Sequence, residues 1–114
     1  MSIIDKIRAA RLTQIEAGGF TFTIRRPTAL ERLKLTGSNS DSLLKDFVVG
    51  WSGVKEIDLV PGGTDVTVPF SAELFSEWVV DQPQLWNPIV DGILEAMKAH
   101  DARLQDDEKK PNAG

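Results

Sequence analysis

The chain contains no cysteine and no tyrosine, and His100 is its only histidine among 114 residues. The absence of cysteine excludes a disulfide scaffold, a thiolate metal site and a cysteine nucleophile. No uncharged apolar run reaches the roughly eighteen residues of a membrane span, and charged residues interrupt the first twelve positions. The sequence therefore predicts no signal peptide and no membrane segment, and the fold has to be stabilised by packing.

Size and composition are those of one folded domain. Apolar residues make up 41% of the chain and charged residues 26%, which excludes wholesale disorder and a membrane class. A chain of this length has room for one hydrophobic core. We expect a single domain over residues 1–105 and a disordered charged tail over residues 106–114, where Ala113 is the only apolar residue.

The first third of the chain predicts a short helix followed by a β-hairpin. Ser2 and Asp5 form a capping pattern for a helix over residues 2–10. Strand-forming residues follow at 11–16 and 20–26, and the Gly-Gly pair between them suits a tight reversal. In the second strand, alternation places three apolar side chains on one face, which we expect to be core. These side chains are Phe20, Phe22 and Ile24.

Two helices are predicted in the middle of the chain. Thr28 and Glu31 form a second capping pattern that opens a helix through about Leu35, with a stop at Gly37. Ser40 or Asp41 is expected to cap the next, strongly apolar helix, which Gly53 closes. The apolar residues of that helix are Leu43, Leu44, Phe47, Val48 and Trp51.

The second half of the chain predicts a hairpin and then helices. Residues 54–59 are expected to pair with residues 65–70 across a turn of proline and two glycines. Ser71 caps a helix that runs through Asp81. Proline at position 83 breaks that helix, and an Asn-Pro pair at 87–88 starts a last helix that ends at about Gln105. The predicted fold is α+β: a small single domain with two β-hairpins, four to five helices and a helical C-terminal half.

No pattern in the sequence indicates catalysis. His100 has no second histidine beside which to bind a metal, and no serine lies in a nucleophile motif. The glycine pairs lack the spacing and the lysine of a phosphate-binding loop. We therefore expect a non-catalytic protein with no cofactor and no metal.

Charge is distributed unevenly along the chain. Residues 1–57 hold nine Lys and Arg against six Asp and Glu, whereas residues 58–114 hold four against eleven, so the halves carry about +3 and −7. This asymmetry fits either two differently solvated faces or copies that stack head to tail as a homo-oligomer. The basic residues nearest to a nucleic-acid footprint are too few for us to expect DNA or RNA binding. They are Arg25, Arg26, Arg32 and Lys34.

Three segments, in this order, resemble the phage tail assembly chaperone family. They are GFTFTIRRPT at 19–28, FVVGWSGV at 47–54 and VPFS at 68–71. The resemblance covers about residues 17–105, and its motifs are structural. It implies a protein of the infected host's cytoplasm that binds the tail tape measure protein and helps recruit tail tube subunits. Such a protein is not expected in the mature virion.

The resemblance also suggests where a partner would bind. An apolar groove that covers the helical stripes of a tape measure would be formed by the last two predicted helices, although the same side chains are ordinary core material. The predicted partner-binding residues are Phe75, Trp78, Trp86, Ile89, Ile93 and Met97. A different class stays open at this point: a head–tail connector or tail completion subunit that uses the charge asymmetry to build a ring.

Overall fold

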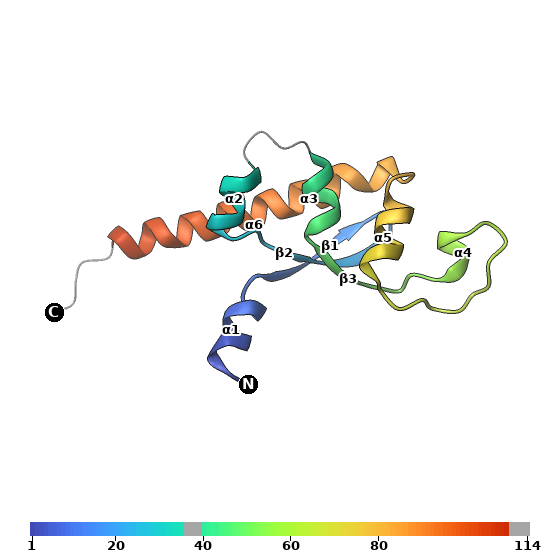
Figure 1. Ribbon diagram of the computed structural model, residues 1–114, viewed down its shortest axis with the longest axis horizontal. Helices are drawn as coiled ribbons and strands as arrows, with labels where there is room; N and C mark the ends of the chain where they lie inside the picture. Colours follow the sequence, from blue (N-terminus) through green and yellow to red (C-terminus); the bar gives the residue numbers. More distant parts are fainter. Residues whose placement is uncertain (36–39, 110–114) are drawn as a thin grey trace.

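A computed structural model describes residues 1–35 and 40–109, with the backbone alone at 40–41 and 108–109. The described residues form six helices and a three-stranded antiparallel sheet in the order β1-β2-β3, and the C-terminal half is largely helical. The predicted α+β class is confirmed. The molecule extends along its last helix, α6, and α1 stands apart from the other elements (Figure 1).

Helix α1, Ile3–Ala9, begins where the capping pattern places it. The hydroxyl of Ser2 accepts the backbone N–H of Asp5 at 3.1 Å, and the Asp5 carboxylate accepts the N–H of Ser2 at 3.4 Å. This reciprocal capping satisfies two amides that the first turn leaves free. None of the residues of α1 is buried, so the helix contributes little to the core.

The predicted first hairpin is confirmed. Strand β1, Leu12–Ala17, pairs with β2, Phe20–Arg25. Gly18 and Gly19 form the turn with φ values of 60° and 84°, a backbone conformation that residues with a Cβ rarely adopt. In β2, Phe22 is completely buried, which confirms the predicted core face of this strand.

Helix α2, Ala29–Leu35, also has the predicted cap. The Thr28 hydroxyl accepts the N–H of Glu31 at 3.1 Å, and a carboxylate oxygen of Glu31 accepts the N–H of Thr28 at 3.0 Å. The predicted stop and the predicted caps of the next helix concern side chains outside the described residues. These are Gly37, Ser40 and Asp41.

The prediction of a long apolar helix that reaches Trp51 is wrong. Helix α3, Ser40–Asp46, ends early, and Val48–Ser52 forms strand β3, which pairs antiparallel with β2 so that Phe22 lies opposite Trp51. Adjacent β-branched residues and a glycine disfavour a helix here, and β2 offers the backbone partners that a strand needs. Tertiary pairing therefore overrides the helical spacing of the apolar residues.

The second hairpin that was predicted within residues 54–70 is formed only in part. The N–H groups of Glu56, Ile57 and Val68 donate to the carbonyls of Val66, Thr64 and Val54, respectively, at 2.8–2.9 Å. Helix α4, Glu56–Leu59, replaces its first strand, and a single isolated bridge joins Lys55 to Thr67. Local hydrogen bonds favour the helical turn: the carboxylate of Asp58 accepts the N–H of Lys55 at 2.9 Å, and that of Glu56 accepts the N–H of Thr64 at 2.8 Å. Acidic residues that bond to nearby amides compete with a strand ladder.

The last two helices form the main layer against the sheet. Helix α5, Ala72–Val79, is capped by Ser71 as predicted, its hydroxyl accepting the N–H of Leu74 at 3.0 Å. Helix α6, Pro83–Lys109, begins before the predicted Asn-Pro start and keeps Pro88 inside it. Proline at the first helical position needs no hydrogen-bond donor. The donor that Pro88 lacks would have bonded an exposed turn, where water can replace it.

Helix α6 also continues to Lys109, four residues beyond its predicted end and into the segment predicted as a disordered tail. Residues 110–114 lie outside the described part of the chain. The core lies between the sheet and helices α3, α5 and α6. Its completely buried side chains come from β2, α5 and α6 and include Phe22, Ile24, Phe75, Val79, Leu85, Ile89 and Ile93.

Candidate functional site

Four of the six predicted partner-binding residues belong to the core. Three have no exposed surface and one is 7% exposed, so they cannot contact a partner in this conformation. They are Phe75, Ile89 and Ile93, with no exposure, and Trp78. Their helical spacing faces the sheet instead of an open groove, and sequence spacing does not distinguish these two situations. Trp86 and Met97 reach the surface, and their contact with a partner stays a prediction.

The burial of α5 follows from an aromatic cluster between this helix and the sheet. The ring of Phe22 lies 5.9 Å from that of Phe75 and 6.5 Å from that of Trp78. Trp51, from β3, packs edge-on against Trp78 at 5.8 Å. Edge-to-face contacts at these distances stabilise a core beyond the area they bury. A partner would have to dismantle the core to reach them.

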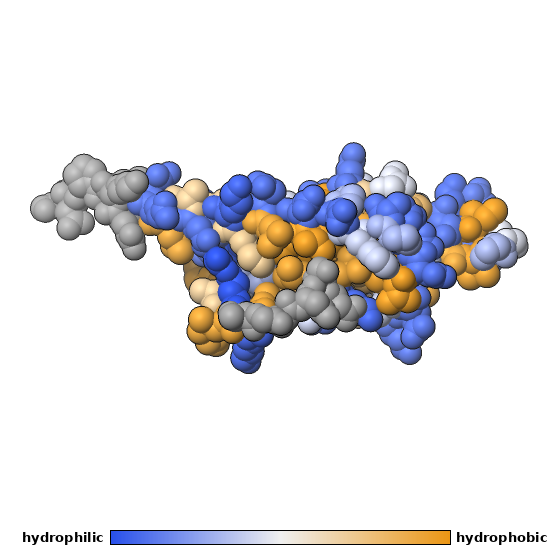
Figure 2. Space-filling model, turned by 90° about the horizontal axis from the view of Figure 1, so that it is seen from above, coloured by the Kyte–Doolittle hydropathy of each residue, from blue (hydrophilic) through white to orange (hydrophobic). Residues whose placement is uncertain are grey.

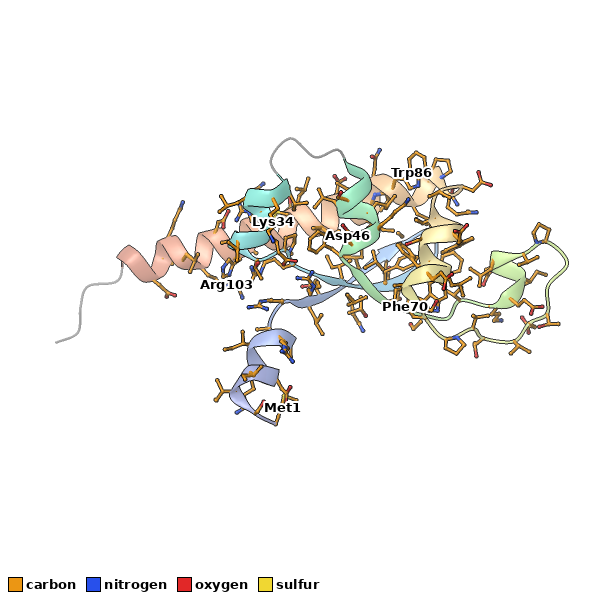
Figure 3. All side chains as sticks on the ribbon, viewed as in Figure 1. Met1, Lys34, Asp46, Phe70, Trp86 and Arg103 are labelled. Atoms are coloured by element: carbon orange, nitrogen blue, oxygen red, sulfur yellow. The ribbon has the colours of Figure 1, made fainter. Side chains whose placement is uncertain are left out.

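Trp86 has a structural role and an exposed face. Its indole N–H donates at 2.7 Å to the backbone carbonyl of Val79, in the last turn of α5, which also accepts the N–H of Gln82 at 3.0 Å. The side chain is 38% exposed, and it lies at the end of α6 opposite to Arg103 (Figure 3).

Two of the sequence motifs meet in space. The indole N–H of Trp51, from FVVGWSGV, donates to the carbonyl of Val68, from VPFS, at 2.7 Å. The rings of Trp51 and Phe70 lie edge to face at 5.3 Å. These contacts attach the long segment that contains α4 to strand β3, so both motifs have a structural role.

Sequence reasoning missed the apolar surface of α1 and α2. Neither helix buries a residue, although both carry large apolar side chains with 51–73% of their surface exposed. These are Ile3, Ile4, Ile7, Leu30 and Leu33. The available signal was that α1 has only isoleucines to bury and no second apolar face. Hydrophobic residues reach the surface at several places along the molecule, between hydrophilic ones (Figure 2).

A cleft of about 490 Å³ lies between α1, the start of α2 and the C-terminal part of α6. We call it the basic cleft. Its apolar lining comes from Ile7, Ala10, Ala29 and Leu104, and its titratable lining comes from Arg11, Arg26, His100, Arg103 and Asp107. Both groups combine residues from 7–29 with residues from 100–107, which is why no local motif indicated the site.

Arg26 is the most unusual group in the basic cleft. Its Nε atom is buried without a hydrogen-bond partner, and one terminal nitrogen donates to the backbone carbonyl of Pro27 at 3.2 Å. Burial lowers the pKa of Arg26, and the nearby Arg11 and Arg103 lower it further. The cleft therefore holds cations close together.

Two ion pairs hold the walls of the basic cleft. Arg32 of α2 donates two hydrogen bonds to the carboxylate of Asp101 of α6, at 2.8 and 3.1 Å. Arg25, at the end of β2, donates two to Glu31 of α2, at 2.7 and 2.9 Å. Paired arginine–carboxylate contacts are geometrically specific, so they fix the orientation of α2 against β2 and α6.

A second hollow of about 540 Å³ lies beside the outer edge of β3. Its lining includes Val48 and Val49 of β3, Phe70, and Ala72 and Glu73 at the start of α5. Val49 is 41% exposed.

The described residues contain no group of three or more His, Cys, Asp and Glu side chains arranged to hold a metal ion. Within the same part of the chain, no helix has the length and apolarity needed to cross a membrane. Comparisons with protein-family models, with curated proteins and with solved structures find no match for this chain.

Proposed function

We propose that this chain is a phage or prophage tail assembly chaperone. It binds the tail tape measure protein in the host cytoplasm, helps recruit tail tube subunits, and leaves before the virion is complete. The resemblance of three ordered segments, at 19–28, 47–54 and 68–71, supports the family.

The observation that carries the proposal is the unpartnered apolar surface of α1 and α2. A small domain stabilises itself by removing apolar surface from water, at about 25 cal/mol per Å². Ile3, Ile4, Ile7, Leu30 and Leu33 remain exposed, so these two helices gain little of that stabilisation within this chain, although Leu35 at the end of α2 packs against the core. Exposed apolar faces of amphipathic helices are typical of surfaces that bind another protein.

An exposed apolar surface of this kind suits a partner protein that is helical. An amphipathic helix binds a groove through side chains spaced three and four residues apart, and it aggregates when its apolar stripe is left in water. We propose that the binding surface lies on α1, α2 and the adjoining part of α6, because the apolar residues Phe75 and Trp78 of α5 are buried. Trp86, which is partly exposed at the other end of α6, is a second predicted contact with the partner.

Co-expression tests the proposal. We expect the tape measure protein encoded with this chain to become soluble in its presence and to remain bound through size-exclusion chromatography. Ile7→Glu with Leu33→Glu should abolish the complex, because both replace exposed apolar surface by charge without touching the core. Val66→Glu, at an exposed apolar position in the segment after α4, is the matched control and should leave the complex intact. An intact complex with the double variant, or no complex with the native chain, would contradict the proposal.

A head–tail connector or tail completion subunit is the second candidate. Residues 1–57 carry a formal charge of about +3 and residues 58–114 one of about −7. Charge asymmetry of this kind favours a heterologous contact between copies, which can close into a ring. Sedimentation of the chain alone separates the two functions, because a defined ring formed without the tape measure protein favours the connector.

A further inference from the structure

We propose that the basic cleft binds a carboxylate-bearing amphipathic helix of a partner protein. Arg26 and Arg103 hold a carboxylate of that helix, and its apolar side chains pack against Ile7 and Leu104. The inference rests on the proposed function in taking the occupant to be a protein, and it adds the chemistry by which the partner segment is recognised.

Arg26 carries an unsatisfied donor beside the cleft. The Nε–H of Arg26 is shielded from water, and no acceptor lies within hydrogen-bond distance of it. Leaving a buried donor of a charged group without a partner costs folding free energy, so such groups usually have an acceptor. That Nε–H has no exposed surface, so a partner cannot reach it in this conformation. The terminal nitrogens of the Arg26 guanidinium, which lines the cleft, match the two oxygens of a carboxylate.

The lining of the cleft is predominantly cationic. Arg11, Arg26 and Arg103 face the cleft, and no ion pair is found for them among the residues that the structure describes. Asp107 is the one acidic residue of the lining, and Asp101 nearby is engaged by Arg32. The lining thus keeps a surplus of positive charge in a chain whose formal net charge is −4.

The composition of the cleft wall favours a protein over a nucleic acid as the occupant. Apolar side chains, Ile7 and Leu104 among them, form much of the cleft wall, and no Phe or Trp lies in the lining on which a base could stack. Mixed cationic and apolar walls therefore favour an acidic, amphipathic peptide.

The apolar surface around the cleft favours an amphipathic helix as the occupant. The same two helices that form walls of the cleft carry further exposed apolar side chains, including Ile3, Leu30 and Leu33. An amphipathic helix with a carboxylate beside its apolar stripe contacts both features at once, through residues three and four positions apart. An isolated anion would use the arginines and leave this apolar surface in water.

The test is a titration of the ¹⁵N-labelled chain by NMR. The probe is a blocked helical peptide with leucines along one face and glutamates beside them, and the matched probe has glutamine in place of each glutamate. We expect saturable shifts of the amides of Ala10, Ala29 and Arg103, and about tenfold weaker binding of the glutamine peptide, as for loss of one charge-assisted hydrogen bond. Added salt should weaken the glutamate peptide more than the glutamine peptide.

Variants connect the binding to the arginines. Arg103→Gln removes an exposed side chain and should weaken the glutamate peptide about tenfold while the fold persists. Arg26→Gln should weaken it at least as much, with circular dichroism confirming that the variant is folded. Lys98→Gln is the control, since Lys98 lies outside the cleft and pairs with Glu95 on the same helix. Its affinity for the peptide should be unchanged.

Three results would overturn the inference. Equal affinity of the two peptides, or unmoved cleft amides at millimolar peptide, would remove the carboxylate from the recognition. Inorganic phosphate or a single-stranded oligonucleotide that produces the same shifts at lower concentration would assign the arginines to a phosphate-bearing ligand instead. The titration needs no tape measure protein, so a failed co-purification and a failed titration count against different proposals.

Discussion

Replacing Glu31 by glutamine should destabilise the fold by an amount that depends on pH. The Glu31 carboxylate accepts two hydrogen bonds from Arg25 and one from the backbone of Thr28, and Arg25 also lies 4.8 Å from the ring centre of Phe47. The Arg25–Glu31 pair therefore joins the end of β2, the start of α2 and Phe47, the residue before β3. Glutamine keeps the shape and can still accept the Thr28 N–H, so the variant removes mainly the charge.

The size of the effect follows from the pKa of Glu31. The hydrogen bonds from Arg25, which contribute most, lower the pKa of this carboxyl from 4.5 to about 2. A shift of this size in a shielded pair would correspond to roughly 3 kcal/mol. Because about a third of each side chain is exposed, with fractions of 35% for Glu31 and 29% for Arg25, solvent screening reduces it. We expect a loss of about 1 to 2 kcal/mol in the free energy of unfolding at neutral pH.

The pH dependence has a definite sign. The unfolded state takes up the proton on Glu31 near its ordinary pKa of 4.5, before the folded state does near about 2, so this stabilisation is complete above 4.5 and is lost as pH falls through that window. Urea unfolding followed by tryptophan fluorescence should show a large gap between native chain and variant at about pH 7 and a smaller gap at about pH 3. Glu95→Gln, which removes an exposed carboxylate, is the control and should change stability by less than about 0.5 kcal/mol. A gap between Glu31→Gln and the native chain that does not change with pH would refute the reasoning.

Three further outcomes follow from local geometry. Trp51→Phe should cost about 2 kcal/mol in urea unfolding, because it removes the indole N–H that joins two motifs and leaves a carbonyl without its donor. Gly18→Ala should cost at least about 1 kcal/mol in thermal unfolding, because φ is +60° and a Cβ would lie 2.5 Å from Leu85 Cδ2. The pKa of His100 is lowered by burial and then by Arg26 and Arg103, so NMR titration of Arg103→Gln should show it raised toward its usual 6.5. As this pKa is depressed in the folded state, protonation of His100 should cost stability as pH falls below about 6.5.

Local signals in the sequence were sufficient for the ends of elements. The caps at Ser2, Thr28 and Ser71 and the glycine turn of the first hairpin depend on neighbours within a few residues, and all four are confirmed. Strand β3 was missed because its pairing partner β2 is distant in sequence and its apolar residues also have helical spacing. The start of α6 differs from the prediction because Pro83, predicted to separate two helices, occupies the first position of α6, where proline needs no hydrogen-bond donor.

The candidate site was less predictable than the fold. Helical spacing identified Phe75 and Ile93 as apolar positions on one face, but only the assembled layers show that this face meets the sheet. The basic cleft brings Arg26 beside Arg103 from opposite ends of the sequence, and no pattern in a single sequence reports such a meeting. Two features of the sequence relate to this site: the surplus of basic residues in its first half, and a first helix with few apolar residues to bury.

Helix α6 has a mechanical consequence. Its first half is embedded in the core through Leu85 and Ile93, whereas Lys109 lies about 18 Å beyond Met97 at the helical rise of 1.5 Å per residue. No glycine or proline interrupts the stretch between them, so the helix bends little there. A force that a bound partner applies near Lys109 therefore acts as a torque on the core, into which the first half of α6 packs.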